Sequence, residues 1–141
     1  MPAPRVFRWL AFFFAILIVL IIIAADLDLV PDLLNPIYAF PNGDKIAHFL
    51  LMGTLSLLIS LGFKNERTRF LGIRRGTLLL AIIITLEECS QIYFDNRKFS
   101  ITDMLANWGG IFIMGELGSA LRSVMVRRGR EQAGSETQAS E

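Results

Sequence analysis

The chain has few charged residues and very few cysteines or histidines. Its one cysteine, Cys89, excludes an internal disulfide. Charged residues make up 19% of the 141 residues and hydrophobic residues 53%, whereas a soluble domain has roughly 25% charged residues. The net charge of +1 says nothing about partners, so the position of each charge has to be considered instead. We predict no nucleic-acid partner, no cofactor and no metal.

The chain instead contains several long apolar segments. The first, from Trp9 to Ala25, is unbroken. It exceeds the roughly 7–15 residues of a signal-peptide core and reaches the roughly 17–25 residues of a membrane span, so we interpret it as an uncleaved transmembrane helix. Three further runs follow it. The predicted fold class is an all-α integral membrane protein, a compact bundle of four transmembrane helices at about residues 7–25, 44–62, 76–93 and 103–121.

The segments between and after the spans are polar or broken by proline. Residues 26–42 contain three prolines, and we expect a loop along the membrane interface there. Asn42 or Asp44 is positioned to cap the helix that follows. The sequence therefore predicts a single membrane domain at residues 1–125. Residues 126–141 lack apolar side chains for packing and are predicted to form a flexible cytoplasmic tail.

Basic residues fall mainly on one side of the four spans. With the N-terminus in the cytoplasm, eleven of the fourteen Lys and Arg residues lie on the cytoplasmic side. The exceptions are Lys45, Arg97 and Lys98. The positive-inside rule therefore predicts that both termini are cytoplasmic.

Polar and ionisable side chains gather at the outer ends of the second, third and fourth spans. At about 1.5 Å of rise per residue, His48, Glu88 and Asn107 all lie roughly 4–8 Å below the outer boundary. Such side chains are costly inside a membrane and persist mainly where they pair or act. The predicted ligand-binding residues are Lys45, His48, Glu88, Gln91, Arg97, Asp103 and Asn107.

Each of these residues also has a purely structural interpretation. Glu88 and Arg97 can form a buried ion pair, and Asp103 can cap the fourth span. Asn107 can bond to another helix, and such contacts contribute about 0.6–2 kcal/mol each. For close helix packing, however, the chain already has small residues: Gly53, Ser56, Ser60, Gly109, Gly110, Gly115 and Gly118. The number of ionisable groups therefore favours a function for the set as a whole.

Three motifs in this region carry a family resemblance. D-K-x-x-H begins at Asp44, E-x-x-Q begins at Glu88, and R-x-x-S-x-x-D-x-x-x-N-x-x-G begins at Arg97. Over about residues 44–115, their order and spacing resemble the VanZ-like family of small bacterial membrane proteins. That family is named after a protein associated with resistance to the glycopeptide teicoplanin. The resemblance implies a multi-pass protein of the bacterial inner (plasma) membrane and cell envelope, and an expected link to glycopeptide resistance follows from it alone.

The first of three functional hypotheses is binding of a lipid headgroup or a lipid-linked envelope intermediate. Lys45 and Arg97, with Lys98 beside them, offer positive charge to a phosphate, which arginine can bind through two parallel hydrogen bonds. The partners would then be membrane lipids, with an anionic headgroup or a lipid-linked precursor as the ligand.

The second hypothesis is a membrane-embedded enzyme, with His48 as the candidate catalytic residue. Imidazole titrates near neutral pH, and Glu88 or Asp103 could orient it as a general base. A metal version would use the same three residues as ligands. The neighbouring cations Lys45 and Arg97 would repel a metal ion, and no H-E-x-x-H motif is present. The third hypothesis is a structural or partner-binding subunit without chemistry of its own.

Overall fold

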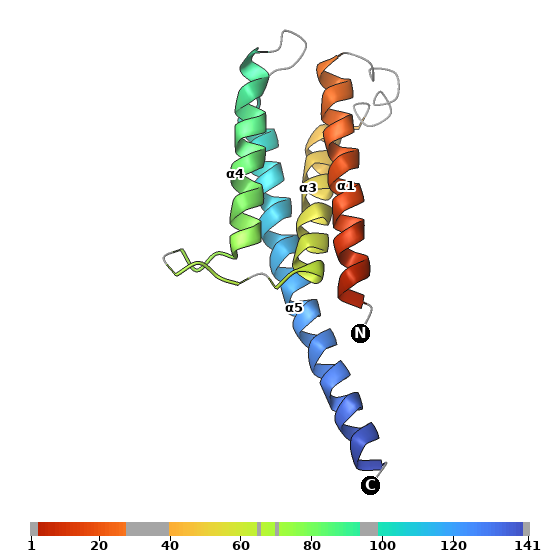
Figure 1. The fold of residues 1–141 in the computed structure, drawn as a ribbon. Coiled ribbons are helices and arrows are strands. Elements are labelled where there is room, and N and C mark those ends of the chain that lie inside the picture. Colours follow the sequence, from red (N-terminus) through yellow and green to blue (C-terminus); the bar gives the residue numbers. More distant parts are fainter. Residues whose placement is uncertain (1–2, 28–39, 65, 70, 94–98, 140–141) are drawn as a thin grey trace.

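The computed structural model describes residues 3–27, 40–64, 66–69, 71–93 and 99–139. Helices dominate these residues, and they lie side by side along most of their length (Figure 1). In chain order the elements are α1 (Ala3–Asp26), α3 (Gly43–Gly62), α4 (Arg75–Ser90), the short 3₁₀ helix η1 (Gln91–Tyr93) and α5 (Ile101–Ala139).

Four helical segments are long and apolar enough to cross a membrane: 5–26, 43–62, 75–93 and 101–132. The prediction of four membrane-spanning helices is therefore confirmed at the level of length and composition. The surface agrees with this assignment, because many large apolar side chains on the helices are exposed, such as Phe13 at 61% and Leu86 at 65%. Exposed apolar side chains of this number and size are expected where lipid is the solvent.

Glycine lets α3 and α5 approach closely. A Cβ atom added at Gly110 of α5 would overlap the carbonyl oxygen of Phe49 on α3. One added at Gly115 would lie 2.6 Å from Ser56 Oγ, and one added at Gly118 would lie 2.8 Å from the carbonyl oxygen of Leu57. Helices in lipid gain their packing energy from such close contact between backbones. This glycine seam, formed by Gly53, Gly110, Gly115 and Gly118, fixes the register of α5 against α3.

The core lies beside the glycine seam and joins the other helices to it. Ile111 of α5 is fully buried, and it packs with Met52 and Leu55 of α3 and with Ile84 of α4. Helix α1 contributes Ile18 to the same cluster. Away from the core, α1 is anchored to the far end of α3 by Arg8, whose Nε donates a 2.9 Å hydrogen bond to the carbonyl oxygen of Gly62.

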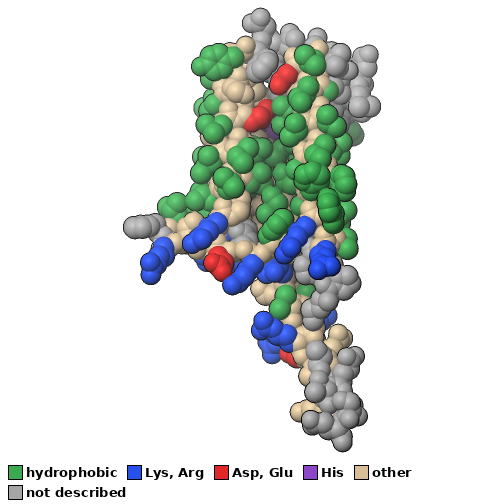
Figure 2. Space-filling model, in the orientation of Figure 1, with side chains coloured by type: hydrophobic (Ala, Val, Ile, Leu, Met, Phe, Trp, Pro, Cys, Tyr) green, Lys and Arg blue, Asp and Glu red, His purple; other side chains and the backbone are tan. Residues whose placement is uncertain are grey.

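The bundle has one end rich in cationic side chains. We call it the basic end and define it by Arg8, Lys64, Arg67, Arg74 and Arg75. Figure 2 shows these cationic groups gathered below the apolar band. Here Glu116 of α5 accepts hydrogen bonds from Arg67 Nη2 at 2.9 Å and from Arg74 Nε at 3.1 Å. The connection between α3 and α4 is thereby tied to α5.

Helix α5 continues well beyond the bundle (Figure 1). We predicted a flexible tail at residues 126–141, and the structure continues α5 as a helix to Ala139, beyond the predicted end of the fourth span at about residue 121. The physical reason is that the membrane span has already provided the costly helix nucleus, so each added residue gains a hydrogen bond. Arg127 and Glu131 also form an ion pair at 3.0 Å, four residues apart on the exposed surface.

Asn42 occupies the predicted cap position of α3 but without the side-chain hydrogen bond, and the cap of α5 differs from the one predicted. Asn42 adopts a left-handed conformation (φ 59°) and makes no capping hydrogen bond through its side chain, and the helix begins at Gly43. At α5 the cap is Ser100, whose Oγ accepts a 3.3 Å hydrogen bond from the backbone N–H of Asp103. The sequence S-x-x-D is a known helix-start pattern. The Asp103 carboxylate is thus free to face α3.

Candidate functional site

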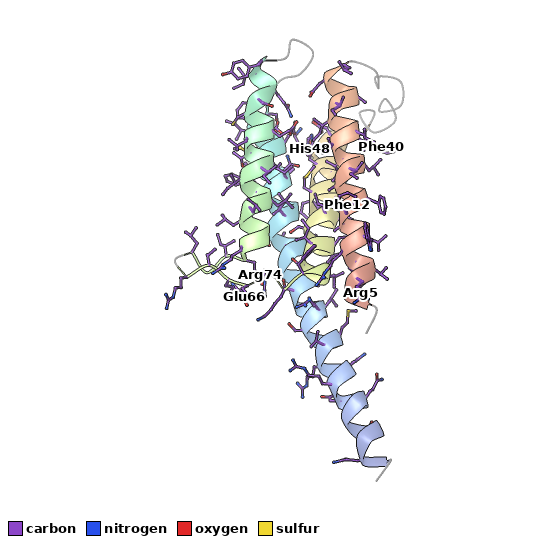
Figure 3. All side chains as sticks on the ribbon, in the orientation of Figure 1. Arg5, Phe12, Phe40, His48, Glu66 and Arg74 are labelled. Carbon is purple, nitrogen blue, oxygen red and sulfur yellow. The ribbon has the colours of Figure 1, made fainter. Side chains whose placement is uncertain are left out.

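Polar side chains gather at the end of the bundle opposite the basic end. Figure 3 places His48 there, on the inner side of α3 and far from Arg74 and Glu66. We define the polar cluster by the following residues from α3, α4, η1 and the start of α5: Asp44, Lys45, His48, Glu87, Glu88, Gln91, Ser100, Asp103 and Asn107.

Two contacts join α3 to α5 within the polar cluster. Lys45 Nζ lies 3.4 Å from Asp103 Oδ1, and one helical turn deeper His48 Nδ1 lies 3.2 Å from Asn107 Oδ1. The first is an ion pair that lacks the geometry of a hydrogen bond. The second is a hydrogen bond in which the amide oxygen accepts from the imidazole N–H. Asn107 is only 1% exposed, so this bond is shielded from solvent.

Lys45 is held by carboxylates on both sides. Besides Asp103, its Nζ contacts Asp44 Oδ2 at 2.7 Å. The side chains of Lys45 and Asp44 are 33% and 32% exposed, and that of Asp103 is 16% exposed. These three residues therefore form the accessible rim of the cluster, above the partly buried His48 and its buried partner Asn107.

Glu88 of α4 is the most deeply buried ionisable group of the cluster, with 1% of its surface exposed. Its Oε1 accepts a 3.4 Å hydrogen bond from the backbone N–H of Ser100. The carboxyl group also interacts electrostatically with His48 and Asp103. Its Oε2 has no hydrogen-bond partner among the residues that the structure describes. One carboxyl oxygen inside the cluster is therefore left without a donor.

Gln91 completes the cluster from η1. It is 3% exposed, and its Nε2 donates a 3.2 Å hydrogen bond to Glu87 Oε1. The side-chain donor of Gln91 is thus directed to Glu87, four residues back in the last turn of α4. Glu88, the neighbour of Glu87, receives no side-chain donor from this residue.

The structure therefore brings together six of the seven predicted site residues: Lys45, His48, Glu88, Gln91, Asp103 and Asn107. Arg97 lies outside the described residues, and with it the predicted Glu88–Arg97 interaction, as does Lys98. The predicted interfacial loop also falls largely outside them.

Sequence reasoning missed three members of the polar cluster: Asp44, Glu87 and Ser100. Asp44 precedes Lys45 directly, and Glu87 stands four residues before Gln91, a spacing at which side chains on a helix meet. Ser100 stands three residues before Asp103, as expected of a helix cap. Asp44 and Ser100 also occupy positions of the motifs given above, so each of the three residues had a signal in the sequence.

The cavity between α4 and α5 lies beside the cluster rather than over it. Its volume is about 340 Å³, and its lining is almost wholly apolar, with Ile82, Thr85, Trp108 and Phe112 among the residues. Within it the Trp108 Nε1–H donates a 2.9 Å hydrogen bond to Thr85 Oγ1. Thr85 stands one turn from Glu88, and Trp108 follows Asn107, so the groove begins next to the cluster.

The metal hypothesis lacks a suitable set of ligands among the residues that the structure describes. No group of three or more His, Cys, Asp and Glu side chains there is placed to hold a metal ion. The hydrogen bond made by His48 goes to Asn107 and not to Glu88 or Asp103. An amide oxygen fixes the ring orientation, but it is uncharged and does not stabilise an imidazolium as a carboxylate would.

Comparisons of the chain with protein-family models, with curated proteins and with solved structures found no match.

Proposed function

We propose that this chain is a VanZ-like protein of the bacterial inner membrane whose polar cluster binds the headgroup of a lipid or of a lipid-linked envelope intermediate. In this proposal the polar cluster faces outward and the basic end faces the cytoplasm, together with both termini. A role in glycopeptide (teicoplanin) resistance is part of the same proposal and rests on the motif resemblance alone.

The observation that carries the proposal is the buried Glu88 carboxyl with an unpartnered oxygen. Packing four helices does not require such a group, and the glycine seam already supplies close packing between α3 and α5. Ionisable residues within membrane spans are costly and usually mark a binding or transport site. The rim formed by Asp44, Lys45 and Asp103 leaves this site reachable from one membrane face.

A lipid fits the surroundings of the cluster better than a water-soluble ligand. The cluster lies at the ends of three helical segments that are long and apolar enough to cross a membrane, and the ends of such segments are expected where headgroup and hydrocarbon meet. The apolar groove between α4 and α5 begins one helical turn away, at Thr85. When a headgroup is bound in the cluster, an acyl chain of the same lipid can therefore lie along this groove.

Native mass spectrometry of the detergent-purified protein tests the proposal by showing which lipids remain bound. We expect the wild type to retain one lipid class and the Lys45→Gln variant to lose it. Lys64→Gln is the matched control, because Lys64 contacts Glu66 at 2.8 Å in the same way at the basic end. Identical lipids on all three proteins would overturn the proposal, and the cluster would then be structural.

A further inference from the structure

The polar cluster has more hydrogen-bond acceptors than donors. Its described side chains include four carboxyl groups, at Asp44, Glu87, Glu88 and Asp103, and one ammonium group, at Lys45. Lys45 is already engaged by Asp44 and Asp103, and Gln91 by Glu87. A ligand that brought only a phosphate would add acceptors where donors are missing.

Two carboxyl oxygens show where donors are lacking. Glu88 Oε2 is buried and has no hydrogen-bond partner among the described residues, whereas Asp103 Oδ1 is buried and has only the 3.4 Å ion pair with Lys45 Nζ. Nearly all buried polar atoms in folded proteins are hydrogen-bonded, so each exception calls for a partner. Glu88 Oε1 accepts a hydrogen bond from the backbone N–H of Ser100, and the Oγ of the same Ser100 accepts one from the backbone N–H of Asp103, so Glu88 and Asp103 lie on either side of Ser100.

We infer that the polar cluster recognises the primary amine of an aminophospholipid headgroup, with Glu88 Oε2 accepting an N–H from the ammonium. This inference rests on the proposed function and specifies its ligand. A primary ammonium has three N–H donors in addition to its charge. The headgroup phosphate then stays at the rim near Lys45, whose side chain is 33% exposed.

The test is a competition among three phospholipids with identical acyl chains. Phosphatidylethanolamine carries a primary amine, phosphatidylcholine keeps the charge but has no N–H, and phosphatidylglycerol has hydroxyl groups only. They are mixed in equal amounts in detergent with the purified protein, and native mass spectrometry gives the bound ratios. We expect the wild type to prefer phosphatidylethanolamine over phosphatidylcholine by about tenfold, the effect of one charge-assisted hydrogen bond.

Two variants assign the preference to one carboxyl group. Glu88→Gln keeps the shape of the side chain and should bring the ratio close to one. Glu116→Gln is the control, since it removes a carboxylate from α5 at the basic end and should keep the wild-type ratio. If Glu88→Gln does not fold, the mono- and dimethylated ethanolamine lipids serve instead. Binding to the wild type should then fall with each N–H removed.

The outcomes separate the inference from the function on which it rests. If lipid retention depends on Lys45 but phosphatidylcholine binds as well as phosphatidylethanolamine, the amine inference fails and headgroup binding stands. If no lipid is retained in a Lys45-dependent way, both fail. Arg97 is the competing donor predicted from the sequence. If Arg97→Gln, like Glu88→Gln, removes the preference for phosphatidylethanolamine over phosphatidylcholine, Arg97 is the donor to Glu88 Oε2 and the inference is overturned.

Discussion

At the residue scale, contacts in the polar cluster are of two kinds. The His48–Asn107 hydrogen bond joins α3 to α5 and is partly buried, with Asn107 itself fully buried. The Glu88 carboxyl is buried but satisfied at only one oxygen. The first arrangement stabilises the fold, whereas the second leaves an acceptor available for a ligand. Substitutions at these residues should therefore have different consequences.

A double-mutant cycle at His48 and Asn107 measures the first kind of contact. We expect a coupling free energy of about 0.6 kcal/mol, with about 1.7 kcal/mol as the upper end, because polar contacts between helices in membranes fall in this range. The measurement is reversible unfolding of the His48→Ala, Asn107→Ala and double variants in mixed micelles. A parallel cycle of His48→Ala with Thr102→Ala, at an exposed residue of α5, should give no coupling. Additive effects in the first cycle would contradict the hydrogen bond.

At the scale of the helices, the glycine seam determines how α3 and α5 pair. Gly109 and Gly110 are neighbours on α5, yet they differ sharply in their surroundings. A Cβ at Gly109 would lie 3.5 Å from the Phe49 ring, an ordinary contact, whereas one at Gly110 would overlap the Phe49 backbone. The seam therefore depends on the position of each glycine and not on glycine content.

This contrast predicts that Gly110→Ala lowers the free energy of unfolding by about 1–3 kcal/mol, the usual cost of overpacking. Gly109→Ala in the same helix should have a much smaller effect or none. Thermal unfolding of both variants in the same detergent is the measurement. Equal melting temperatures for the two variants would be inconsistent with the close approach of α3 and α5.

The number of long apolar helices could be predicted from the sequence, because the length of each apolar run determines it. The depth of the polar residues below the membrane boundary stays a prediction from the rise of an α-helix. The pairing of side chains could not be predicted, because it depends on the register between α3 and α5. Lys45 and His48 are three residues apart, while their partners Asp103 and Asn107 are four apart. The two pairs of side chains meet despite the unequal spacing because α3 and α5 pack closely at Gly53 and Gly110. The sequence around the paired residues does not indicate this packing.

The continuation of α5 to Ala139 was missed for a different reason. Composition indicates whether a segment can pack in a core, and residues 126–139 lack the apolar side chains to do so. It does not indicate whether a helix already formed upstream will extend. Arginine, glutamate, glutamine and alanine, which are common here, are all good helix formers.

At the scale of the whole molecule, the distribution of charge predicts the orientation in the membrane. In a Cys89→Ser background, which has no cysteine, Asn42→Cys should react with a membrane-impermeant maleimide in intact cells. Ser135→Cys should react only after the membrane is opened, because the proposed topology places it in the cytoplasm. Both residues are exposed in the structure, so burial does not bias the comparison. The reverse pattern would invert the topology and place the polar cluster on the cytoplasmic face.

Helix α5 carries Asp103 and Asn107 near its first turns and is unbroken for 39 residues. At about 1.5 Å per residue, the distance from Gly115 to Ala139 is roughly 36 Å. If α5 rotated by about 5° about the glycine seam, its C-terminal end would move by roughly 3 Å, as follows from that length. A small rearrangement around a ligand on one side of the bilayer would thus become a displacement of the arginine-bearing segment on the other side, with no hinge in between.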